Sequence, residues 1–260
     1  MRLIFLGTGT SFGVPQIACR CATCTSSDPR DRRTRSGALL ETGGKRLLID
    51  TPPELRLQLV AAGIDRIDAV LFTHAHADHV HGIDDLRALS VRQGQMLPAY
   101  GSAATMAELA AKFPYIFDPS FMVNPATSKP ELAAHVLEPG TPESIAGVSV
   151  LPLSLPHGGH HVFGYRVGPV AYLTDVKTIP DAVMGELADL EVLVLNALLP
   201  RPHPLHLSIP EAVEAAQRIG ARRTFFTHLT HDATHAALAA RLPAGIAPAY
   251  DGLVIDVDGT

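Results

Sequence analysis

The sequence predicts an α/β protein whose β-sheets are covered by helices. Short apolar segments typical of strands alternate along the chain with segments in which apolar residues recur at helical spacing. Some of the helical segments begin at a capping residue or end at a glycine. The composition agrees with this class, because 47% of the 260 residues are hydrophobic and 18% are charged, as expected for a folded chain with one sizeable core.

The N-terminal third is predicted to contain four strands and one helix. The strands are predicted from apolar runs at residues 2–6, 37–42, 46–50 and 68–72. The last of these runs leads directly into a group of histidines. Residues 53–63 are predicted to form a helix because their apolar residues are spaced helically and Gly63 ends the pattern.

The rest of the chain continues the alternation. Helices are predicted at residues 102–113, with Ser102 as the N-cap, and at 180–190, 208–220 and 234–242. Strands are predicted at residues 148–155, 163–167, 170–174, 191–196, 223–227 and 252–257. Residues 114–145 are rich in Pro, Ser and Glu and are expected to form an irregular loop.

No internal repeat or low-complexity linker divides the chain, so residues 1–260 are expected to form a single domain. The formal net charge of −5 gives no general attraction to nucleic acid or to an anionic membrane. No stretch approaches the roughly 18 apolar residues of a membrane helix, and no signal-peptide core precedes the first glycine. The odd number of cysteines argues against a disulfide framework. We therefore expect a cytoplasmic protein with no membrane partner.

The segment FTHAHADHVHG places four histidines and an aspartate directly after an apolar strand. His74 and His76 can project to one side of the chain, and Asp78 and His79 can turn back toward them from the following loop or first helical turn. Imidazoles suit zinc, manganese, iron or nickel and carboxylates suit harder metals, so the metal stays open. A loop of solvated histidines is the less favoured alternative. His81 fits no ligand position and is expected beside the ligands or in solvent.

The motif HAHADH resembles the H-x-H-x-D-H motif of the metallo-β-lactamase fold, a four-layer αββα sandwich that holds two metal ions where its sheets meet. The resemblance implies further ligands downstream, and candidates that each follow an apolar strand stand in the same order here. One ion would be bound by His74, His76 and His157, the other by Asp78, His79 and His228, and Asp175 would bridge both. Alone, each of the downstream residues is more typical of a strand-end cap. With a histidine at position 76, the motif resembles that of the hydrolytic members of this fold rather than that of its redox members.

Cys19, Cys21 and Cys24 offer three thiolates within six residues, and a structural zinc site uses four Cys or His ligands. No fourth ligand stands nearby in the sequence. His231, three residues after His228, is our candidate, because one short segment would then serve both kinds of site. A cluster of buried or reactive thiols is the alternative. The short spacing favours metal binding.

Together, the two motifs resemble the PhnP-like family of phosphoribosyl 1,2-cyclic phosphate phosphodiesterases. The resemblance covers nearly the whole chain through GTGTSFGVP, C-x-C-x-x-C, HAHADH, YLTD, HPLHLS and THLTH. A pyrroloquinoline quinone biosynthesis relative is similar around the cysteines. The resemblance implies two divalent ions at the active site, Mn or Zn, together with one structural Zn. It also implies a small cyclic or sugar phosphodiester as substrate, with 5-phosphoribosyl 1,2-cyclic phosphate as one candidate, and it is compatible with a homodimer.

The expected catalytic residues are Asp78, one of the ligands, and His206. Two divalent ions would neutralise a phosphodiester and lower the pKa of a bound water, so a metal hydroxide is the expected nucleophile. The sugar alkoxide leaves with a proton, and the resemblance associates His206 with this acid/base work. His203 is the alternative, and each of the two can also be a structural loop histidine. Asp50 resembles a residue that orients a metal-bound imidazole, although a strand-end cap is nearly as typical.

Two other functions stay open. Transfer-RNA 3′-processing endonucleases share the metal motif, but an acidic chain without an evident basic arm argues against nucleic acid as a partner. A non-catalytic, metal-stabilised binding or carrier module, related to pyrroloquinoline quinone biosynthesis, is disfavoured because closed structural zinc sites need no shared carboxylate.

Two further motifs are given no catalytic role. The arginines of RDRRTR fit a phosphate contact or, preferably, a solvated loop; they are Arg30, Arg32, Arg33 and Arg35. GTGTSFG is not a dinucleotide fingerprint, because Phe12 stands where a glycine is required. No nucleotide cofactor is expected.

Overall fold

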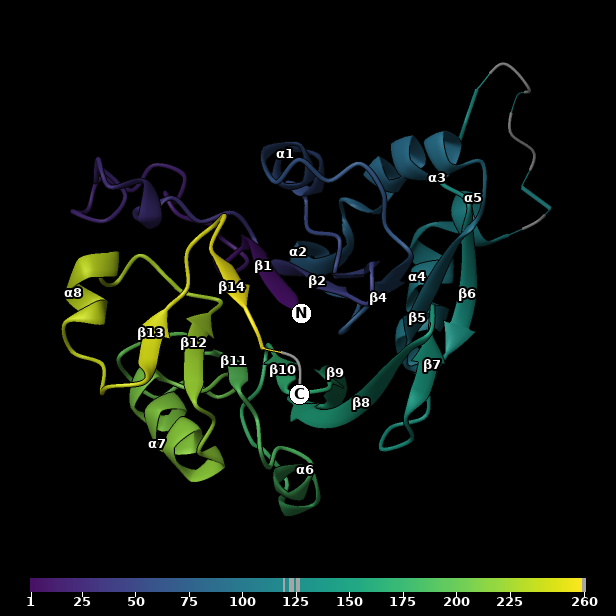
Figure 1. The fold of residues 1–260 in the computed structure, drawn as a ribbon. Helices are drawn as coiled ribbons and strands as arrows, with labels where there is room; N and C mark the ends of the chain where they lie inside the picture. The colour runs from purple at the N-terminus through teal and green to yellow at the C-terminus, as the bar shows by residue number, and fades with distance from the viewer. Residues whose placement is uncertain (119, 122–123, 125–126, 259–260) are drawn as a thin grey trace.

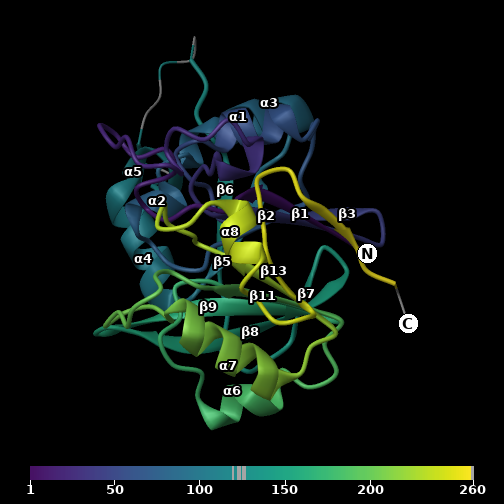
Figure 2. The same ribbon diagram turned by 90° about the vertical axis from the view of Figure 1, so that its left-hand side faces the viewer.

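The computed structural model describes residues 1–118, 120–121, 124 and 127–258, and two β-sheets lie face to face between outer helices (Figures 1 and 2). The first sheet has the strand order β14-β1-β2-β3-β4-β5-β6. Its strands are β1 (Arg2–Gly7), β2 (Gly37–Thr42), β3 (Lys45–Ile49), β4 (Ala69–Leu71), β5 (Leu97–Gly101), β6 (Leu132–Val136) and β14 (Val254–Asp256). Strands β3 to β6 are parallel. Their carboxyl ends therefore deliver the residues that follow them to one edge of the sheet.

The second sheet has the strand order β13-β12-β11-β10-β9-β8-β7. Its strands are β7 (Glu143–Ile145), β8 (Val148–His157), β9 (His160–Val167), β10 (Val170–Leu173), β11 (Val192–Asn196), β12 (Arg223–Thr227) and β13 (Ile246–Pro248). Strands β10 to β13 are parallel, whereas β8 and β9 form an antiparallel hairpin. The second sheet thus also gathers its strand ends at a common edge.

Strand alternation explains why the sheets are buried on both faces. In β1, Leu3 and Phe5 join the apolar cluster between the two sheets, whereas Ile4 and Leu6 join the cluster beneath the first layer of helices. Successive side chains of a strand point to opposite faces, so each apolar residue of this strand is buried on one side or the other. A third cluster lies between the second sheet and its helices. Three interfaces separate four layers, so the predicted αββα sandwich is confirmed.

The helices form the two outer layers. The helices beside the first sheet are α1 (Leu55–Ala61), α2 (Ala77–Val80), α3 (Arg87–Gln93), α4 (Ala103–Lys112) and α5 (Pro114–Phe117), and those of the second half are α6 (Asp181–Gly185), α7 (Ile209–Ile219) and α8 (His235–Ala239). Ser102 caps α4 through the backbone N–H of Thr105, as predicted. Ser208 and Glu211 form a capping box at the start of α7. In the described part of the chain, no helix is long and apolar enough to span a membrane.

The sequence prediction was wrong over part of residues 114–145. Helix α5 and strands β6 and β7 lie in this segment, which was expected to be irregular; residues 119, 122–123 and 125–126 lie outside the described residues. Strands β5 and β13 were also missed. Both contain a proline, and β5 has the sequence LPAYG without a β-branched residue, so neither carries the local pattern of a strand. Pairing with neighbouring strands stabilises them instead.

Candidate functional site

The candidate active site lies at the edge where strand ends from both sheets meet. The residues that follow β4, β10 and β12, and the last residue of β8, bring together side chains far apart in the sequence. Potential ligand atoms lie within 4.8 Å of one another in four overlapping groups: His74, His76 and His157; His74, His79 and Asp175; Asp78, His79 and His228; and His157, Asp175 and His206. The structure therefore places all seven predicted ligands in one cluster.

The local backbone is shaped for this convergence. Helix α2 starts right after His76, and its first turn carries Asp78 and His79 back toward the strand end. Asp50, Asp175 and His228 adopt left-handed backbone angles, with φ of 62°, 59° and 56°. Non-glycine residues in this region are disfavoured and concentrate at functional sites. The site is thus held in geometry that an unconstrained chain would avoid.

The cluster contains carboxylates whose negative charge is not balanced by any Lys or Arg side chain that the structure describes. Asp50 and Asp175 are buried and Asp78 is half-buried. Within the described residues, every ion-pair partner of Asp78 and Asp175 is a histidine and none is Lys or Arg. Burial lowers the pKa of His79, but Asp175, Asp50 and Asp78 outweigh it and raise the pKa of this imidazole well above its usual value. Bound cations fit this excess of carboxylates.

The ligand atoms also lack protein partners. The Nε2 atoms of His74, His79 and His228 are buried without a hydrogen-bond partner among the described residues. His79 Nε2 lies 3.2 Å from Asp175 Oδ2, and His228 Nε2 lies 3.3 Å from Asp175 Oδ1. Two ligands with metal bonds of about 2.1 Å in tetrahedral geometry lie about 3.4 Å apart. The separations therefore suit metal ions that use these nitrogens and oxygens together.

Neighbouring groups orient the ligands. His79 Nδ1 lies 2.7 Å from Asp50 Oδ2, and Asp50 also accepts hydrogen bonds from the backbone N–H and the hydroxyl of Thr73, both at 2.8 Å. The Thr174 hydroxyl donates to Asp175 Oδ2 at 2.7 Å. Such contacts fix the tautomer and direction of a ligand. Thr73 and Thr174 were missed by sequence reasoning, although each directly precedes a predicted ligand.

His206 lies inside the cluster rather than on a free loop. Its Nδ1 atom is 3.6 Å from Asp175 Oδ1, and its ring centroid is 5.0 Å from those of His157 and His228. Burial lowers the pKa of His206 to about 3, and neighbouring histidines act in the same direction against Asp175. His203 is half-buried, with its ring 5.1 Å from that of His206. His206 is therefore the closer of the two to the predicted metal ligands.

The segment that carries His206 is fixed at several points. Leu207 N–H donates to the carbonyl of Val176 at 2.7 Å, one residue beyond Asp175. His157 Nδ1 lies 3.2 Å from the carbonyl oxygen of Leu205. The capping box of α7 begins two residues after His206. These contacts couple the position of His206 to two of the predicted ligands.

The three cysteines and His231 form a second cluster. The Nδ1 atom of His231 lies 3.3, 3.4 and 3.5 Å from the sulfurs of Cys19, Cys21 and Cys24. A tetrahedral zinc with Zn–S of about 2.3 Å and Zn–N of about 2.0 Å separates sulfur from nitrogen by about 3.5 Å. A backbone N–H from Cys24 contributes most to lowering the pKa of Cys21 to about 6. The geometry thus fits a closed four-ligand site.

Several residues lie outside both clusters. His81 is exposed to solvent, with its ring 6.0 Å from that of Phe113. This is one of the two positions that were expected for it. For Arg33 neither interpretation was right. It is buried and donates to the Thr8 hydroxyl at 2.9 Å and to the carbonyl of Ala249 at 2.6 Å.

The other arginines of this segment lie at the surface of the same loop. Arg30 pairs with Asp28 at 2.7 Å, and Arg35 pairs with Glu54. Arg32 is exposed and has no ion pair among the described residues. The ion pairs of Arg30 and Arg35 therefore stabilise the loop, and they do not indicate a ligand.

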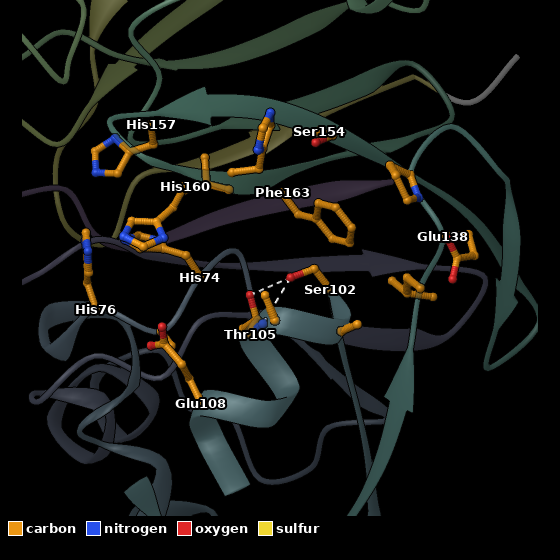
Figure 3. Close-up of a pocket in the computed structure, with 17 residues that line it drawn as sticks. His74, His76, Ser102, Thr105, Glu108, Glu138, Ser154, His157, His160 and Phe163 are labelled. Atoms are coloured by element: carbon orange, nitrogen blue, oxygen red, sulfur yellow. Dashed lines mark hydrogen bonds between the residues drawn. The ribbon is translucent and has the colours of Figure 1, made fainter. Parts of the chain in front are cut away.

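A cavity of about 500 Å³ opens beside the histidines. It is lined at one end by His74, His76 and His157, and it extends between the two sheets past Ser102, Ser154 and Phe163 to Glu138 (Figure 3). The lining comes from the β4–α2, β5–α4 and β6–β7 connections, from α4, and from strands β8 and β9. Sequence reasoning missed it, because these segments share no local motif.

Comparison with known proteins agrees with this geometry. A family model described as a beta-lactamase superfamily domain matches residues 45–229. A solved structure of a new diphosphatase from the PhnP family is 40% identical, with a TM-score of 0.90, and the match covers 99% of this chain and 98% of that one. Zn²⁺-bound PqqB from Methylobacterium extorquens is 20% identical with a TM-score of 0.77, covering 99% and 100% of the two chains, a likeness of fold.

One curated relative is much longer than this chain. It is named octanoyltransferase, from Porphyromonas gingivalis, and it is 38% identical over 261 residues. The match covers 99% of this chain but 52% of that protein. This chain thus spans about half the length of that relative.

Proposed function

We propose that this chain, which belongs to the beta-lactamase superfamily, is a metal-dependent phosphodiesterase acting on a small cyclic or sugar phosphodiester. One observation carries the proposal: two groups of potential ligands meet at a shared buried carboxylate, Asp175, beside an open cavity. The fold of this superfamily implies divalent metal ions, and most of its members are hydrolases. A purely structural site would be closed and would have no need of the cavity.

The proposed ligands divide between two ions, Mn²⁺ or Zn²⁺. One would be held by His74, His76 and His157, the other by Asp78, His79 and His228, with Asp175 shared between them. Ions bound there would supply positive charge for the phosphate and lower the pKa of a bound water. Asp50 would keep His79 in the tautomer that presents Nε2 to the ion, through its contact with Nδ1.

His206 is the proposed proton donor to the leaving oxygen. Its neutral form predominates in the buried site, since its pKa is lowered to about 3. A neighbouring phosphate anion raises the pKa of an imidazole, so substrate binding would favour the protonated form that a proton donor needs. The fixed 203–206 segment supports this role, because proton transfer requires a donor within hydrogen-bond reach.

A structural zinc is proposed at Cys19, Cys21, Cys24 and His231. The fit of the sulfur–nitrogen separations to tetrahedral zinc supports it. His231 of this cluster lies three residues after His228. A zinc ion there would therefore tie the N-terminal loop to a segment that carries a proposed ligand of the active site. The three cysteines form no disulfide, which suits a reducing compartment, and we place the reaction in the cytoplasm on that ground.

The experiment is a substrate panel with the metal-loaded protein. It would contain 5-phosphoribosyl 1,2-cyclic phosphate, the specific substrate suggested by the sequence resemblance, together with a 2′,3′-cyclic nucleotide, precursor transfer RNA and a thioester. We expect turnover of a small cyclic diester that disappears with a chelator and returns with Mn²⁺ or Zn²⁺. Preferred cleavage of precursor transfer RNA would instead support the nuclease alternative. No turnover of any compound would support a binding or carrier module.

A further inference from the structure

We infer that the cavity beside His76 and His157 binds an uncharged, hydroxyl-bearing organic group of the substrate, and that Glu108 and Glu138 discriminate against a second phosphate there. The inference rests on the proposed function and narrows its substrate class, because it disfavours 5-phosphoribosyl 1,2-cyclic phosphate, which carries a second phosphate. It concerns the part of the substrate that does not react.

The geometry points the substrate into this cavity. His74, His76 and His157 line one end, Glu138 lies at the other, and Ser102 and Ser154 lie on opposite sides between them (Figure 3). A phosphate held at the histidine end would direct its substituent along the space between the sheets. The volume of about 500 Å³ is within the range of about 300–1,000 Å³ that is usual for small-molecule sites. It therefore accommodates a sugar with an attached ring.

The charge of the lining is unfavourable to a second phosphate. Glu108 and Glu138 line the cavity, and no Lys or Arg does so among the described residues. Glu108 is partly neutralised by Lys112, at 3.3 Å. Glu138 is exposed and has no ion pair in the described part of the chain. A phosphate near Glu138 would meet a like charge, which costs free energy.

The start of α4 does not reverse this balance. The Ser102 hydroxyl already accepts a hydrogen bond from the backbone N–H of Thr105 at 3.1 Å, so the helix has its capping acceptor. The helix dipole adds about half a positive charge, which is less than the charge of the two carboxylates.

The remaining lining suits a sugar and a flat ring. Carboxylates and serine hydroxyls accept hydrogen bonds from sugar hydroxyls, as an acidic residue does for the ribose of a dinucleotide. Leu137, Val162 and Phe163 supply an apolar wall, against which an uncharged ring can pack. A nucleoside has both features.

Two positive side chains, Lys177 and Arg201, lie outside this cavity and influence His203. Burial contributes most to lowering the pKa of His203, and Lys177 and Arg201 contribute further. Lys177 pairs with Glu211 at 2.6 Å, and Arg201 lies 3.7 Å from Asp232. Neither cation lines the cavity, so neither offsets the charge of Glu108 and Glu138 there.

The test compares two substrates that differ in one phosphate. Adenosine 2′,3′-cyclic phosphate and its 5′-phosphorylated form would be assayed with the metal-loaded protein at pH 8, where a free imidazole is neutral. We expect kcat/KM to be at least tenfold higher for the form without the 5′-phosphate. The E108Q/E138Q double variant should reduce this ratio to about threefold or less, by accelerating hydrolysis of the phosphorylated form.

The matched control is Glu143→Gln, which removes an equal charge from an exposed residue on β7 that does not line the cavity. It should leave the ratio of kcat/KM values unchanged. A wild-type preference for the 5′-phosphorylated substrate would overturn the inference, and so would a double variant that keeps the wild-type ratio.

Two further measurements separate this inference from the proposed function. Bis(p-nitrophenyl) phosphate is a diester without a sugar, so its hydrolysis tests phosphodiesterase activity alone. Calorimetric titration of the metal-loaded protein with adenosine 3′-phosphate and with adenosine 3′,5′-bisphosphate reads the preference of the cavity without turnover. At least tenfold tighter binding of the monophosphate supports the inference even if no diester is cleaved, and equal or reversed affinities contradict it.

Discussion

The histidine and aspartate cluster and the cysteine cluster both offer convergent metal ligands, yet they differ in openness and in charge. The first shares a buried carboxylate among its ligand groups, leaves imidazole nitrogens without partners and adjoins a cavity of about 500 Å³. The second has four ligands, and none of them lines the cavity. Open sites leave room for a reactant, whereas closed tetrahedral sites stabilise structure.

The difference shows that ligand type alone does not indicate catalysis. His228 and His231 are three residues apart on one segment, but their partners give them different proposed roles. His228 Nε2 lies 3.7 Å from Asp78 and 3.3 Å from Asp175, whereas His231 contacts only thiols within its cluster. Changes to the histidine and aspartate cluster should therefore lower turnover more than stability. Changes to the cysteine cluster should lower stability more than turnover.

The largest expected effect is on the shared carboxylate. Asp175→Asn should lower kcat/KM on the order of 10⁴-fold, because an amide cannot supply the negative charge that binds both ions. Metal analysis should show loss of ions from this site and retention of one zinc at the cysteines. Asp181→Asn, at an exposed position of α6, is the matched control and should resemble the wild type. Full activity of the Asp175 variant would remove the basis for a catalytic role.

The next largest effect is expected at His206. His206→Ala should lower kcat by about 100-fold or more, because the leaving oxygen would lose its proton donor, while metal content stays unchanged. His203→Ala serves as the comparison and should have a smaller effect. Metal loss from the His206 variant would make this residue a ligand, and a larger effect at position 203 would exchange the two roles.

The cysteine cluster should respond mainly in stability. Cys21→Ser should release about one zinc and lower the Tm by about 10 °C, since structural metal binding contributes directly to folding. Turnover per remaining folded molecule should fall less than tenfold. Ala22→Ser adds the same hydroxyl at the neighbouring exposed position without removing a ligand, so it should keep its zinc. Unchanged zinc content in the Cys21 variant would refute the structural site.

The smallest effect is expected at α7, which follows the His206 segment. Burial raises the pKa of Glu211, but hydrogen bonds from Lys177 and Ser208 outweigh it and lower this pKa to about 2. A lowered folded-state pKa adds stability above the ordinary value of about 4.5, and this stability is lost as the pH falls toward 2. Glu211→Gln should therefore cost about 0.5 kcal/mol at pH 7, because the pair is partly exposed and screened.

The measurement for this helix is denaturant unfolding of the variant and the wild type between pH 2 and 7. The difference between them should shrink as the pH is lowered below about 4.5. Glu214→Gln, at an exposed position of the same helix, should show no such trend. A difference that grows toward low pH would contradict the assigned sign.

The sequence allowed much of the ligand cluster to be predicted, because each ligand follows a recognisable apolar strand and the H-x-H-x-D-H spacing is local. The structure places these residues together, while their metal-binding roles stay predictions. The αββα fold was predicted from resemblance, and it is confirmed. Short strands without β-branched residues, such as β5, were missed because their stability comes from neighbouring strands rather than from local sequence.

Arg33 and the cavity illustrate what local patterns cannot show. A run of arginines predicts a solvated loop, but the hydrogen-bond acceptor that buries Arg33 is the carbonyl of Ala249, 216 positions away. The cavity likewise combines Ser102 and Glu138, from two separate connections, with Ser154 of β8. Neither arrangement has a sequence signal, because both depend on how the two sheets pack.

An anomalous difference map from crystals of the metal-loaded protein would locate the ions at both clusters directly. We expect two peaks bridged by Asp175, among the histidines at one end of the cavity, and one peak enclosed by the three cysteines and His231. A map with density at the cysteines alone, and none beside Asp175 under saturating Mn²⁺ or Zn²⁺, would contradict this expectation.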